Sequence, residues 1–376
     1  MKDKQHIIVV DPTAFAGGSK VATESILGLL GKQQRITVLT ADSSSWKSDS
    51  IQRVKLYEPA WLALQEQGIG YFIRHAFIAL QLLLIRLRLG PFDTAVGASG
   101  PGVDLALYLL RPVMKFKIIQ LIHGPVAKSR TIARCLNAAH QVHYLQSSAL
   151  SLKNALSTLA GNQVTLPANF LLLKNGLTDA QWPTTCQTHT PVIFWAASLL
   201  KWKGLETLIA ALQSMTEHPR THICYIKPKG VQLPVSDAPI LMEMVNWHDN
   251  PDNIDQLRAN SNIFVSTSKN EPFGLSILEA MAAGHCVVIP EDGAYWDLQL
   301  EHNINCVKYA ADDPQDLSEK LLMLSNDLTL INSLGAQGRV VAQDYRAEKQ
   351  YQQIVTCLSS HDIQKQIKNS ATRSVT

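Results

Sequence analysis

Short apolar runs alternate along the chain with longer stretches in which apolar residues recur every three or four positions. The runs are rich in Val and Ile, as in HIIVV near the amino terminus. Such runs are typical of strands buried on both faces, and the longer stretches are typical of amphipathic helices. Before residue 180 this pattern predicts strands at His6–Val10, Arg35–Leu39, Thr94–Gly97, Lys117–Ile122 and His140–Tyr144, and helices at Ser19–Leu30 and Tyr71–Leu89.

The same alternation continues to about residue 290. There it predicts strands at Val192–Ala197, His222–Ile226, Met242–Val245, Ile263–Thr267 and Cys286–Ile289, and helices at Gly204–Met215 and Leu275–Ala283. Strand–helix alternation throughout predicts parallel sheets covered on both faces, an α/β fold of the doubly wound, Rossmann-like type. Ligands of such sheets bind at the carboxyl ends of the strands.

A polar segment divides the two series of strands. After Asn175-Gly176 the stretch TDAQWPTTCQTHT contains proline and lacks periodicity, so we expect a linker there. A chain of 376 residues also favours two domains over one. We therefore predict an amino-terminal domain over 1–182, a second domain over 183–340, and a frayed tail over 361–376.

Composition narrows the class of protein. Hydrophobic residues make up 46% and charged residues 17%, which is typical of a globular protein. The six cysteines form no CxxC or CxxH pair, which argues against a disulfide framework or a zinc site and favours a reducing compartment. The spacing of His140 and His143 would suit two metal ligands, but no carboxylate or cysteine adjoins them in the sequence, so we expect no metal site. The amino terminus shows no export signal, so we expect a cytoplasmic protein.

Charge is unevenly distributed. Residues 1–180 hold 19 Lys and Arg against 10 Asp and Glu, and residues 181–376 hold 15 against 21. The basic first half favours contact with an acidic membrane surface or a phosphate-bearing substrate, and chance placement of surface lysines is the alternative.

The longest apolar run, Ala76–Ile85, has ten residues, about half of the roughly 20 that a spanning helix needs. It lies in a stretch with a basic rim of Arg74, Arg86 and Arg88. We expect this helix to pack on the sheet; an interfacial helix lying on a membrane is the alternative.

The stretch EPFGLSILEAMAAG, from Glu271 to Gly284, offers the most chemistry. It follows a predicted strand and opens a helix, whose first amides and positive dipole end suit phosphate or hydroxyl oxygens. Glu271 and Glu279 are eight residues apart, about 12 Å along a helix. Glycosidase carboxylate pairs lie about 5–9.5 Å apart. We therefore expect the two glutamates to hold separate parts of one ligand, or else to be a dipole-complementing and a solvated residue.

This stretch closely resembles the E-x7-E segment of glycosyltransferase family 4, retaining enzymes of the GT-B fold that use nucleotide sugars. Further matches are IFWAASLLKWKGLETLIAAL with its Lys203-Gly204, Phe15-Ala16-Gly17-Gly18 after the first strand, Leu121-Ile122-His123-Gly124, and Lys174-Asn175-Gly176. The resemblance extends from residue 6 to about residue 290. It implies two Rossmann-like domains facing across a cleft, and a last helix, within 341–360, that packs back on the first domain.

The resemblance implies a donor-binding role for the second domain. Glu271 would contact the transferred sugar, and the amides of Phe273, Gly274 and Leu275 would hold sugar or phosphate oxygens. Glu279 would accept hydrogen bonds from the ribose hydroxyls. Lys203 would neutralise the diphosphate leaving group.

Fewer roles fall to the first domain. Gly17 and Gly18 would bring backbone amides against the same phosphates, and His123 would hydrogen-bond the donor sugar. Glu271 and His123 are thus the implied catalytic pair, and the basic half would take a glycan or lipid-linked acceptor. The implied reaction retains the anomeric configuration and needs no metal or other cofactor, in polysaccharide or surface-glycan synthesis on the cytoplasmic side. We expect no nucleic acid among the partners.

Two departures from the family pattern bear on function. Ala197 and Ser198 stand where the family usually has Gly-Arg, and a serine hydroxyl cannot supply the charged fork of an arginine at the diphosphate. Lys201 is the available substitute. The stretch 227–230 (KPKG) replaces a glycine-rich acidic turn. A sugar-nucleotide epimerase of the same fold, or a non-catalytic nucleotide-sugar-binding scaffold, are therefore the alternatives.

Overall fold

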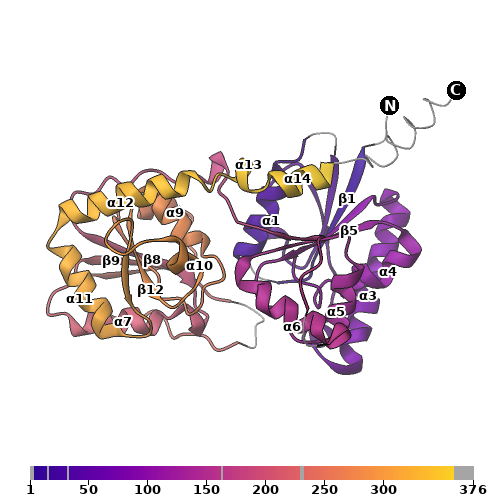
Figure 1. Cartoon of the computed structure of the whole chain (residues 1–376), viewed down its shortest axis with the longest axis horizontal. Coiled ribbons are helices and arrows are strands. Elements are labelled where there is room, and N and C mark those ends of the chain that lie inside the picture. The colour runs from indigo at the N-terminus through magenta and orange to yellow at the C-terminus, as the bar shows by residue number, and fades with distance from the viewer. Residues whose placement is uncertain (1–3, 15–16, 32–33, 162–163, 229–232, 360–376) are drawn as a thin grey trace. The chain divides into compact units, whose positions relative to one another are not determined.

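The computed structural model describes residues 4–14, 17–31, 34–161, 164–228 and 233–359, which form two compact units (Figure 1). Unit 1 comprises the described residues up to Leu173 together with those from Gln350 onward. Unit 2 runs from Lys174 to Lys349. The fold is α/β and doubly wound, with one parallel sheet in each unit.

Unit 1 is built on a seven-stranded sheet in the order β3-β2-β1-β4-β5-β6-β7. Every pairing in it is parallel. The strands are β1 (Gln5–Asp11), β2 (Gln34–Thr40), β3 (Ile51–Lys55), β4 (Thr94–Gly97), β5 (Lys117–Ile122), β6 (Gln141–Tyr144) and β7 (Phe170–Leu172). All seven residues of β1 are buried, as a central parallel strand requires. The strand order reverses between β1 and β4, which makes their carboxyl ends the expected ligand edge.

Helices cover both faces of this sheet (Figure 1). They are α1 (Gly18–Gly28), α2 (Ala60–Ala63), α3 (Gly68–Leu89), α4 (Leu105–Met114), α5 (Arg130–Ala138), α6 (Ala149–Ala160) and α14 (Gln352–Ser359). Ile78 and Leu82 of α3 and Leu107 of α4 join one core with strand residues such as Ile8. The carboxyl-terminal α14 packs beside α1.

Within the described part of the chain, one helix, α3, is long and apolar enough to cross a membrane by length and composition. It has 22 residues, so the run of ten in the sequence is only the middle of a longer apolar helix. One face of α3 packs on the sheet as expected.

Unit 2 is built on a six-stranded parallel sheet in the order β10-β9-β8-β11-β12-β13. The strands are β8 (Val192–Ser198), β9 (Arg220–Ile226), β10 (Val245–Asp249), β11 (Ile263–Val265), β12 (Cys286–Glu291) and β13 (Val307–Ala310). The helices are α7 (Leu205–Ser214), α8 (Ile254–Ala259), α9 (Leu275–Ala283), α10 (Tyr295–Gln299), α11 (Pro314–Ser325), α12 (Leu328–Gln343) and α13 (Ala347–Gln350). Strand order reverses between β8 and β11, so the ligand edge is expected at their carboxyl ends.

One predicted strand was placed wrongly. Met242–Val245 is not a strand; β10 begins at Val245 and runs to Asp249, with the sequence VNWHD. This strand pairs with β9 alone and is only partly buried, so it carries no apolar run. The stretch after Gly176, predicted as a linker, packs in unit 2: Leu177 bridges to Arg346, and the Cys186 amide donates to the Ala283 carbonyl.

Candidate functional site

Lys203 and Glu271 form an ion pair at the carboxyl edge of the unit 2 sheet. Lys203 Nζ lies 2.5 Å from Glu271 Oε2, and the two side chains are only 17% and 13% exposed. The ammonium also sits 4.0 Å from the ring centroid of Trp202. A charge-assisted hydrogen bond in a partly desolvated setting is among the stronger polar contacts in proteins. The two residues, 68 positions apart in sequence, are therefore held as one group.

The turn that presents Lys203 is held by Gly204 and by Thr267, which follows β11. Lys203 closes a single 3₁₀ turn, and Gly204 follows with φ of 71°. A Cβ at Gly204 would lie 2.0 Å from the carbonyl oxygen of Thr267, so only glycine fits. Thr267 Oγ1 donates to the Lys203 carbonyl at 2.8 Å and accepts from Trp195 Nε1 at 3.0 Å.

Glu271 is positioned by the start of α9. Gly274, the residue before the helix, has φ of 79°, and a Cβ there would lie 3.0 Å from Glu271 Cγ. The amides of the first turn, beginning at Leu275, therefore emerge beside Glu271 with no side chain at the cap.

Phe273 has a structural side chain. It is 2% exposed and packs among Tyr295, Trp296 and Tyr345, while Trp296 Nε1 donates to the Gly274 carbonyl at 3.2 Å. This aromatic cluster anchors the loop from within, which leaves the backbone of 273–275 as the part able to meet a ligand.

Glu279 is held by an arginine that sequence reasoning missed. Arg258 Nη2 donates to Glu279 Oε2 at 2.6 Å, and Arg258 Nη1 lies 3.1 Å from Asp255. The Arg258 side chain is 7% exposed, whereas that of Glu279 is 27% exposed. The two glutamates thus pair with different cations. A buried arginine at the end of α8 has no motif to mark it, because its importance depends on packing against α9.

Ser198 ends β8 and is partly exposed at the same carboxyl edge. The substitute cation, Lys201, is exposed at the start of the 3₁₀ turn that ends in Lys203. Lys227 is half-exposed and lies 3.6 Å from Asp249, while residues 229 and 230 lie outside the described residues.

A small cavity borders the ion pair. Glu271 lines it together with Ser266, Ser268 and Asp292. Asp292 caps two turns, accepting from the amides of Asn270 and Ala294. The carboxyl ends of β11 and β12 therefore supply a polar rim beside Glu271.

In unit 1, Gly17 precedes α1 and Gly18 is its first residue. The backbone of Gly17 is extended, with φ of −166°, and its carbonyl accepts from the Lys20 and Val21 amides. Phe15 and Ala16 of the predicted motif lie outside the described residues.

His123 follows β5 and is partly buried. Its Nε2 lies 3.5 Å from Thr23 Oγ1. Its Nδ1 is buried and has no hydrogen-bond partner among the described residues. Burial lowers the pKa of His123 to about 4, so the ring is neutral at physiological pH and acts as a hydrogen-bonding group rather than a cation.

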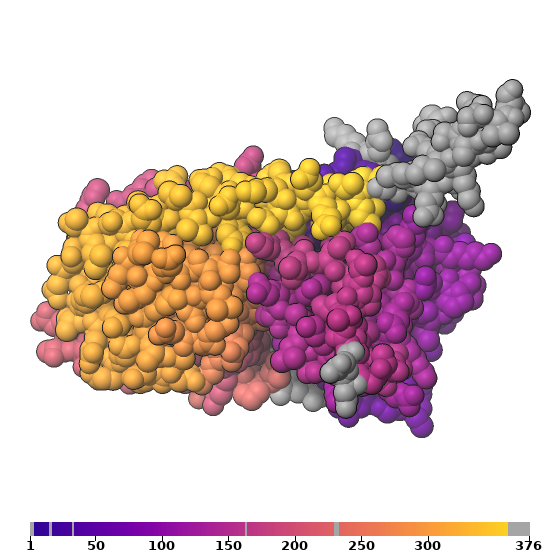
Figure 2. Space-filling model, viewed as in Figure 1, coloured from indigo at the N-terminus to yellow at the C-terminus, as the bar shows by residue number. Residues whose placement is uncertain are grey.

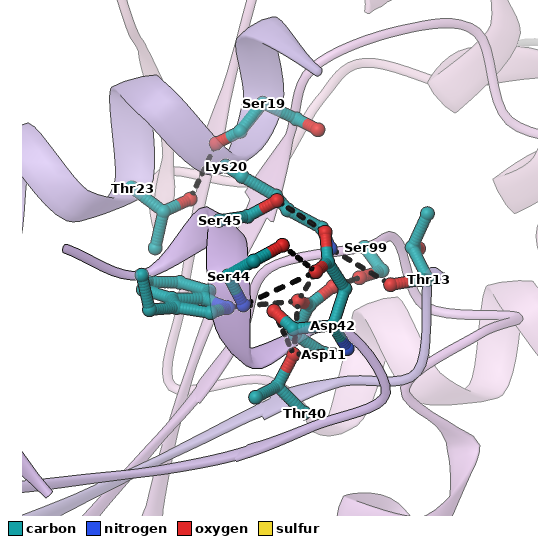
Figure 3. Close-up of polar contacts among 11 residues, drawn as sticks. Asp11, Thr13, Ser19, Lys20, Thr23, Thr40, Asp42, Ser44, Ser45 and Ser99 are labelled. Carbon is teal, nitrogen blue, oxygen red and sulfur yellow. Dashed lines mark hydrogen bonds and ion pairs between the residues drawn. The ribbon is translucent and has the colours of Figure 1, made fainter. Parts of the chain in front are cut away.

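A buried ionic network lies at the carboxyl ends of β1 and β2, and the sequence did not reveal it (Figure 3). Lys20 Nζ lies 3.1 Å from Asp11 and 3.4 Å from Asp42, and it donates to the Thr13 carbonyl at 2.8 Å. Asp11 Oδ2 also accepts from Thr40 at 2.9 Å. In the sequence, Lys20 has the position of a surface residue on an amphipathic helix. Only the fold brings the carboxylates of Asp11 and Asp42 next to it.

His143 and Asp297 each contact a neighbouring side chain. His143 is buried and its Nε2 lies 3.1 Å from Gln141 Oε1. Asp297 forms a 2.7 Å ion pair with Lys308. Among the described residues no three His, Cys, Asp or Glu side chains are placed to hold a metal ion.

Comparison with known proteins agrees with this architecture. Anabaena HepE in complex with UDP-glucose shares the fold with a TM-score of 0.70 and 18% sequence identity, over 95% of this chain and all of that one. Sucrose-phosphate synthase of Thermosynechococcus elongatus has a TM-score of 0.69 and 14% identity, over 98% of this chain and all of that one. WaaG, a glycosyltransferase involved in lipopolysaccharide biosynthesis, has a TM-score of 0.65 and 13% identity, over 94% of this chain and all of that one. The chain is therefore a GT-B protein.

Residues 179–341 match the family model described as glycosyl transferases group 1. Unit 2 accordingly carries a glycosyltransferase group 1 domain. A curated relative, the uncharacterized glycosyltransferase MJ1607 of Methanocaldococcus jannaschii, is 26% identical over 141 residues, 35% of each chain. The match thus spans about a third of that relative.

Proposed function

We propose that this protein is a retaining, family-4-like glycosyltransferase that moves a sugar from a nucleotide-sugar donor to a glycan or lipid-linked acceptor. The observation that carries the proposal is the Lys203–Glu271 pair, placed at the amino end of α9 inside the group 1 domain. HepE, a protein of the same fold, was crystallised with UDP-glucose, which supports a nucleotide-sugar donor here.

Each end of the donor has a proposed contact in unit 2. Lys203 neutralises the departing diphosphate, and Glu271 holds the sugar. Glu279, with Oε2 fixed by Arg258, offers its other oxygen to the ribose hydroxyls. The amides at the start of α9 meet the oxygens between these two ends, where the helix dipole favours negative charge. Pairing before the donor arrives keeps Lys203 and Glu271 in place, so little reorganisation remains for the reaction.

The proposed reaction separates charge on one face of the sugar. The sugar–phosphate bond breaks, the diphosphate takes the electron pair, and the acceptor hydroxyl attacks the same face while its proton passes to the leaving phosphate oxygen. Gly17, Gly18 and His123 contribute to donor binding from unit 1 in this proposal. No metal takes part, so we expect turnover to persist in excess EDTA, and anomeric NMR of the product to show retention.

Ser198 sets how strongly the donor is held. Lys203 is the cation proposed at the diphosphate, and Lys201 is the available substitute for the arginine whose place Ser198 takes. One charge-assisted contact contributes about 1.5–3 kcal/mol, roughly 10- to 150-fold in binding. We therefore expect Ser198→Arg to tighten donor binding by about tenfold or more.

The pathway and location are proposals of the same kind. WaaG, which shares the fold, takes part in lipopolysaccharide biosynthesis. This likeness is consistent with a role in polysaccharide or surface-glycan assembly at the cytoplasmic face of a membrane. The acceptor decides between these roles, since the fold alone hosts many substrates.

A donor screen tests the proposal. UDP-, GDP- and ADP-sugars are compared by thermal shift, because a ligand that binds the folded state raises the unfolding midpoint with occupancy. Transfer from the stabilising donor is then measured for Lys203→Ala and Glu271→Gln, which we expect to lose about 100-fold or more of kcat. The matched controls Lys320→Ala and Glu319→Gln, on α11, should retain full activity. Unchanged turnover in both site variants would contradict the assignment.

The serine at 198 favours a second candidate, a non-catalytic nucleotide-sugar-binding scaffold. Calorimetry separates the two: donor binding without transfer to any acceptor supports the scaffold. Conversion of the donor in the absence of an acceptor would instead indicate an epimerase.

A further inference from the structure

The outer face of α3 is apolar along almost its whole length. After Gly68 its exposed residues are Ile69, Phe72, Ile73, Ala76, Leu80, Leu84 and Leu87, followed by Arg88. Successive members are mostly three or four positions apart, so they form one stripe on the helix surface. Leu80 is 52% exposed and Leu87 is 82% exposed. A surface helix of a globular protein ordinarily shows polar residues on this face.

The stripe is not an unfilled part of the core. The opposite face of α3 is already buried on the sheet through Ile78, Leu82 and Ile85. Only 22% of the most apolar 18-residue window of α3 is buried, and the residues of the stripe are exposed. A helix committed to a sheet on one side lies along a membrane rather than across it.

Neighbouring elements extend the apolar surface. Trp61 of α2 is 64% exposed, and Val113 of α4 is 70% exposed; α2 and α4 both pack against α3. Figure 1 shows α3 and α4 together on one side of the unit 1 sheet, and Figure 2 shows purple atoms of unit 1 at the surface. We call the exposed face of α3 with Trp61 and Val113 the α3 face. Large exposed apolar patches mark interaction sites.

Basic groups lie at one end of the α3 face. Arg86 and Arg88 occupy the last turn of α3, and Arg86 donates to the carbonyl of Met114 at the end of α4. Arg111, Lys115, Lys117 and His140 line a surface hollow at that end of α4. Residues 57–139 contain nine Lys and Arg against four acidic residues, Glu58, Glu66, Asp93 and Asp104. Asp104 is fully buried and Glu58 is paired with Arg74, so the net surface charge of this stretch is positive.

We propose that the α3 face docks unit 1 on a membrane surface containing acidic phospholipids. The apolar stripe enters the boundary between headgroups and acyl chains, and the basic hollow takes a headgroup phosphate. Apolar area and basic charge together are the two attractions that hold such a surface on anionic lipid. Two copies meeting through this face would bring like charges together, which disfavours a symmetric dimer. The proposal goes beyond glycosyl transfer and is measured without any sugar donor.

Vesicle flotation of the full chain tests the α3 face. Vesicles of phosphatidylcholine alone are compared with vesicles that also contain phosphatidylglycerol, at low and high salt. We expect flotation with the anionic vesicles at low salt and marked loss at high salt, since salt screens the basic contribution. We expect Leu80→Glu and Arg88→Glu each to weaken partitioning, by about tenfold or more for Leu80→Glu, which places a charge in the apolar contact.

Matched controls separate the surface from general effects. Leu322 on α11 is 51% exposed, close to Leu80, so Leu322→Glu should float like the unchanged chain. Lys153→Glu, at an exposed position of α6, is the control for Arg88→Glu. Ile69→Glu, at the first turn of α3, replaces Leu80→Glu if that variant does not fold.

Three results would overturn the proposal. The first is no flotation with anionic vesicles at low salt. The second is equal flotation of Leu80→Glu and Leu322→Glu. The third is a dimer in sedimentation that Leu80→Glu dissociates, in a chain that does not bind vesicles, which would make the α3 face a contact between copies.

Discussion

At the scale of single residues, burial decides the charge state of several polar groups. Asp104 is 0% exposed, and it accepts hydrogen bonds from Gln120 Nε2 at 2.8 Å and from the Ser99 amide at 3.1 Å. Burial raises the pKa of Asp104 to about 8 despite these bonds, because a carboxylate loses its hydration there. The folded state therefore keeps Asp104 protonated at neutral pH.

This shift predicts a pH dependence of the stability of unit 1. Between about pH 4 and pH 8 the folded state binds a proton at Asp104 that the unfolded chain has released, so stability falls as pH rises through this range. We expect Asp104→Asn, which stays neutral, to raise the thermal midpoint relative to the unchanged chain at pH 8.5 but much less at pH 5. Thermal scans across pH measure this difference. Asp179→Asn, at a side chain 90% exposed, is the control and should show no such trend.

Buried histidines act in the opposite direction. Burial lowers the pKa of His75 and His143 to about 4, so the stability that they contribute is lost as pH falls from about 6.5 toward 4. These groups are already neutral above pH 7. Protonation of His75 and His143 therefore does not affect the comparison of Asp104→Asn with the unchanged chain at pH 8.5.

At the scale of elements, the strands predicted from the sequence are the inner ones. The edge strands are β3 and β7 in unit 1 and β10 and β13 in unit 2. None of these four was predicted correctly, while each inner strand was found within a few residues. An inner parallel strand is buried on both faces and must be apolar, whereas an edge strand is not; β3, with the sequence IQRVK, buries only Ile51.

Close packing between helices also depends on contacts that local sequence does not show. A Cβ at Gly335 of α12 would lie 2.2 Å from the carbonyl oxygen of Gly284, which ends α9. The two helices pack against each other at this point. Gly335 is therefore required by the approach of α12 to α9 rather than by its own helix.

We expect Gly335→Ala to destabilise unit 2 by about 2 kcal/mol or more, because a backbone carbonyl cannot move aside as a flexible side chain can. Alanine would otherwise favour the helix by about 1 kcal/mol. Urea unfolding followed by circular dichroism measures the change. Ser333→Ala, exposed on the same helix, should change stability by no more than about 0.5 kcal/mol. Equal midpoints for the two variants would contradict the close contact.

At the scale of the whole molecule, the chain leaves unit 1 once and returns to it at its end. The structural division falls after Leu173 and again before Gln350. In α14, Ile354 is 1% exposed and Leu358 is 0% exposed, and the helix packs beside α1. Unit 1 is therefore completed only when its last helix is in place.

Truncation of a core leucine in α14 should thus weaken unit 1. We expect Leu358→Ala to cost about 2–5 kcal/mol, as for other buried leucines. Hydrogen exchange of peptides should show faster exchange in α1 and β1, with unit 2 peptides unchanged. Leu324→Ala, also at 0% exposure but in unit 2, should give the reverse pattern. If Leu358→Ala made exchange faster only in unit 2, the packing of α14 in unit 1 would be wrong.

The sequence by itself determined the α/β class, the inner strands and the Glu271–Gly284 segment, because each depends on periodicity or on residues adjacent in the chain, whereas Lys203-Gly204 was marked only by the resemblance to a known family. Tertiary structure decided which distant groups meet: Lys203 with Glu271, Arg258 with Glu279, and Lys20 with Asp11. It also decided which side of α3 is covered. An apolar pattern shows that a helix has surface to bury, but only the packed molecule shows how much of that surface remains exposed.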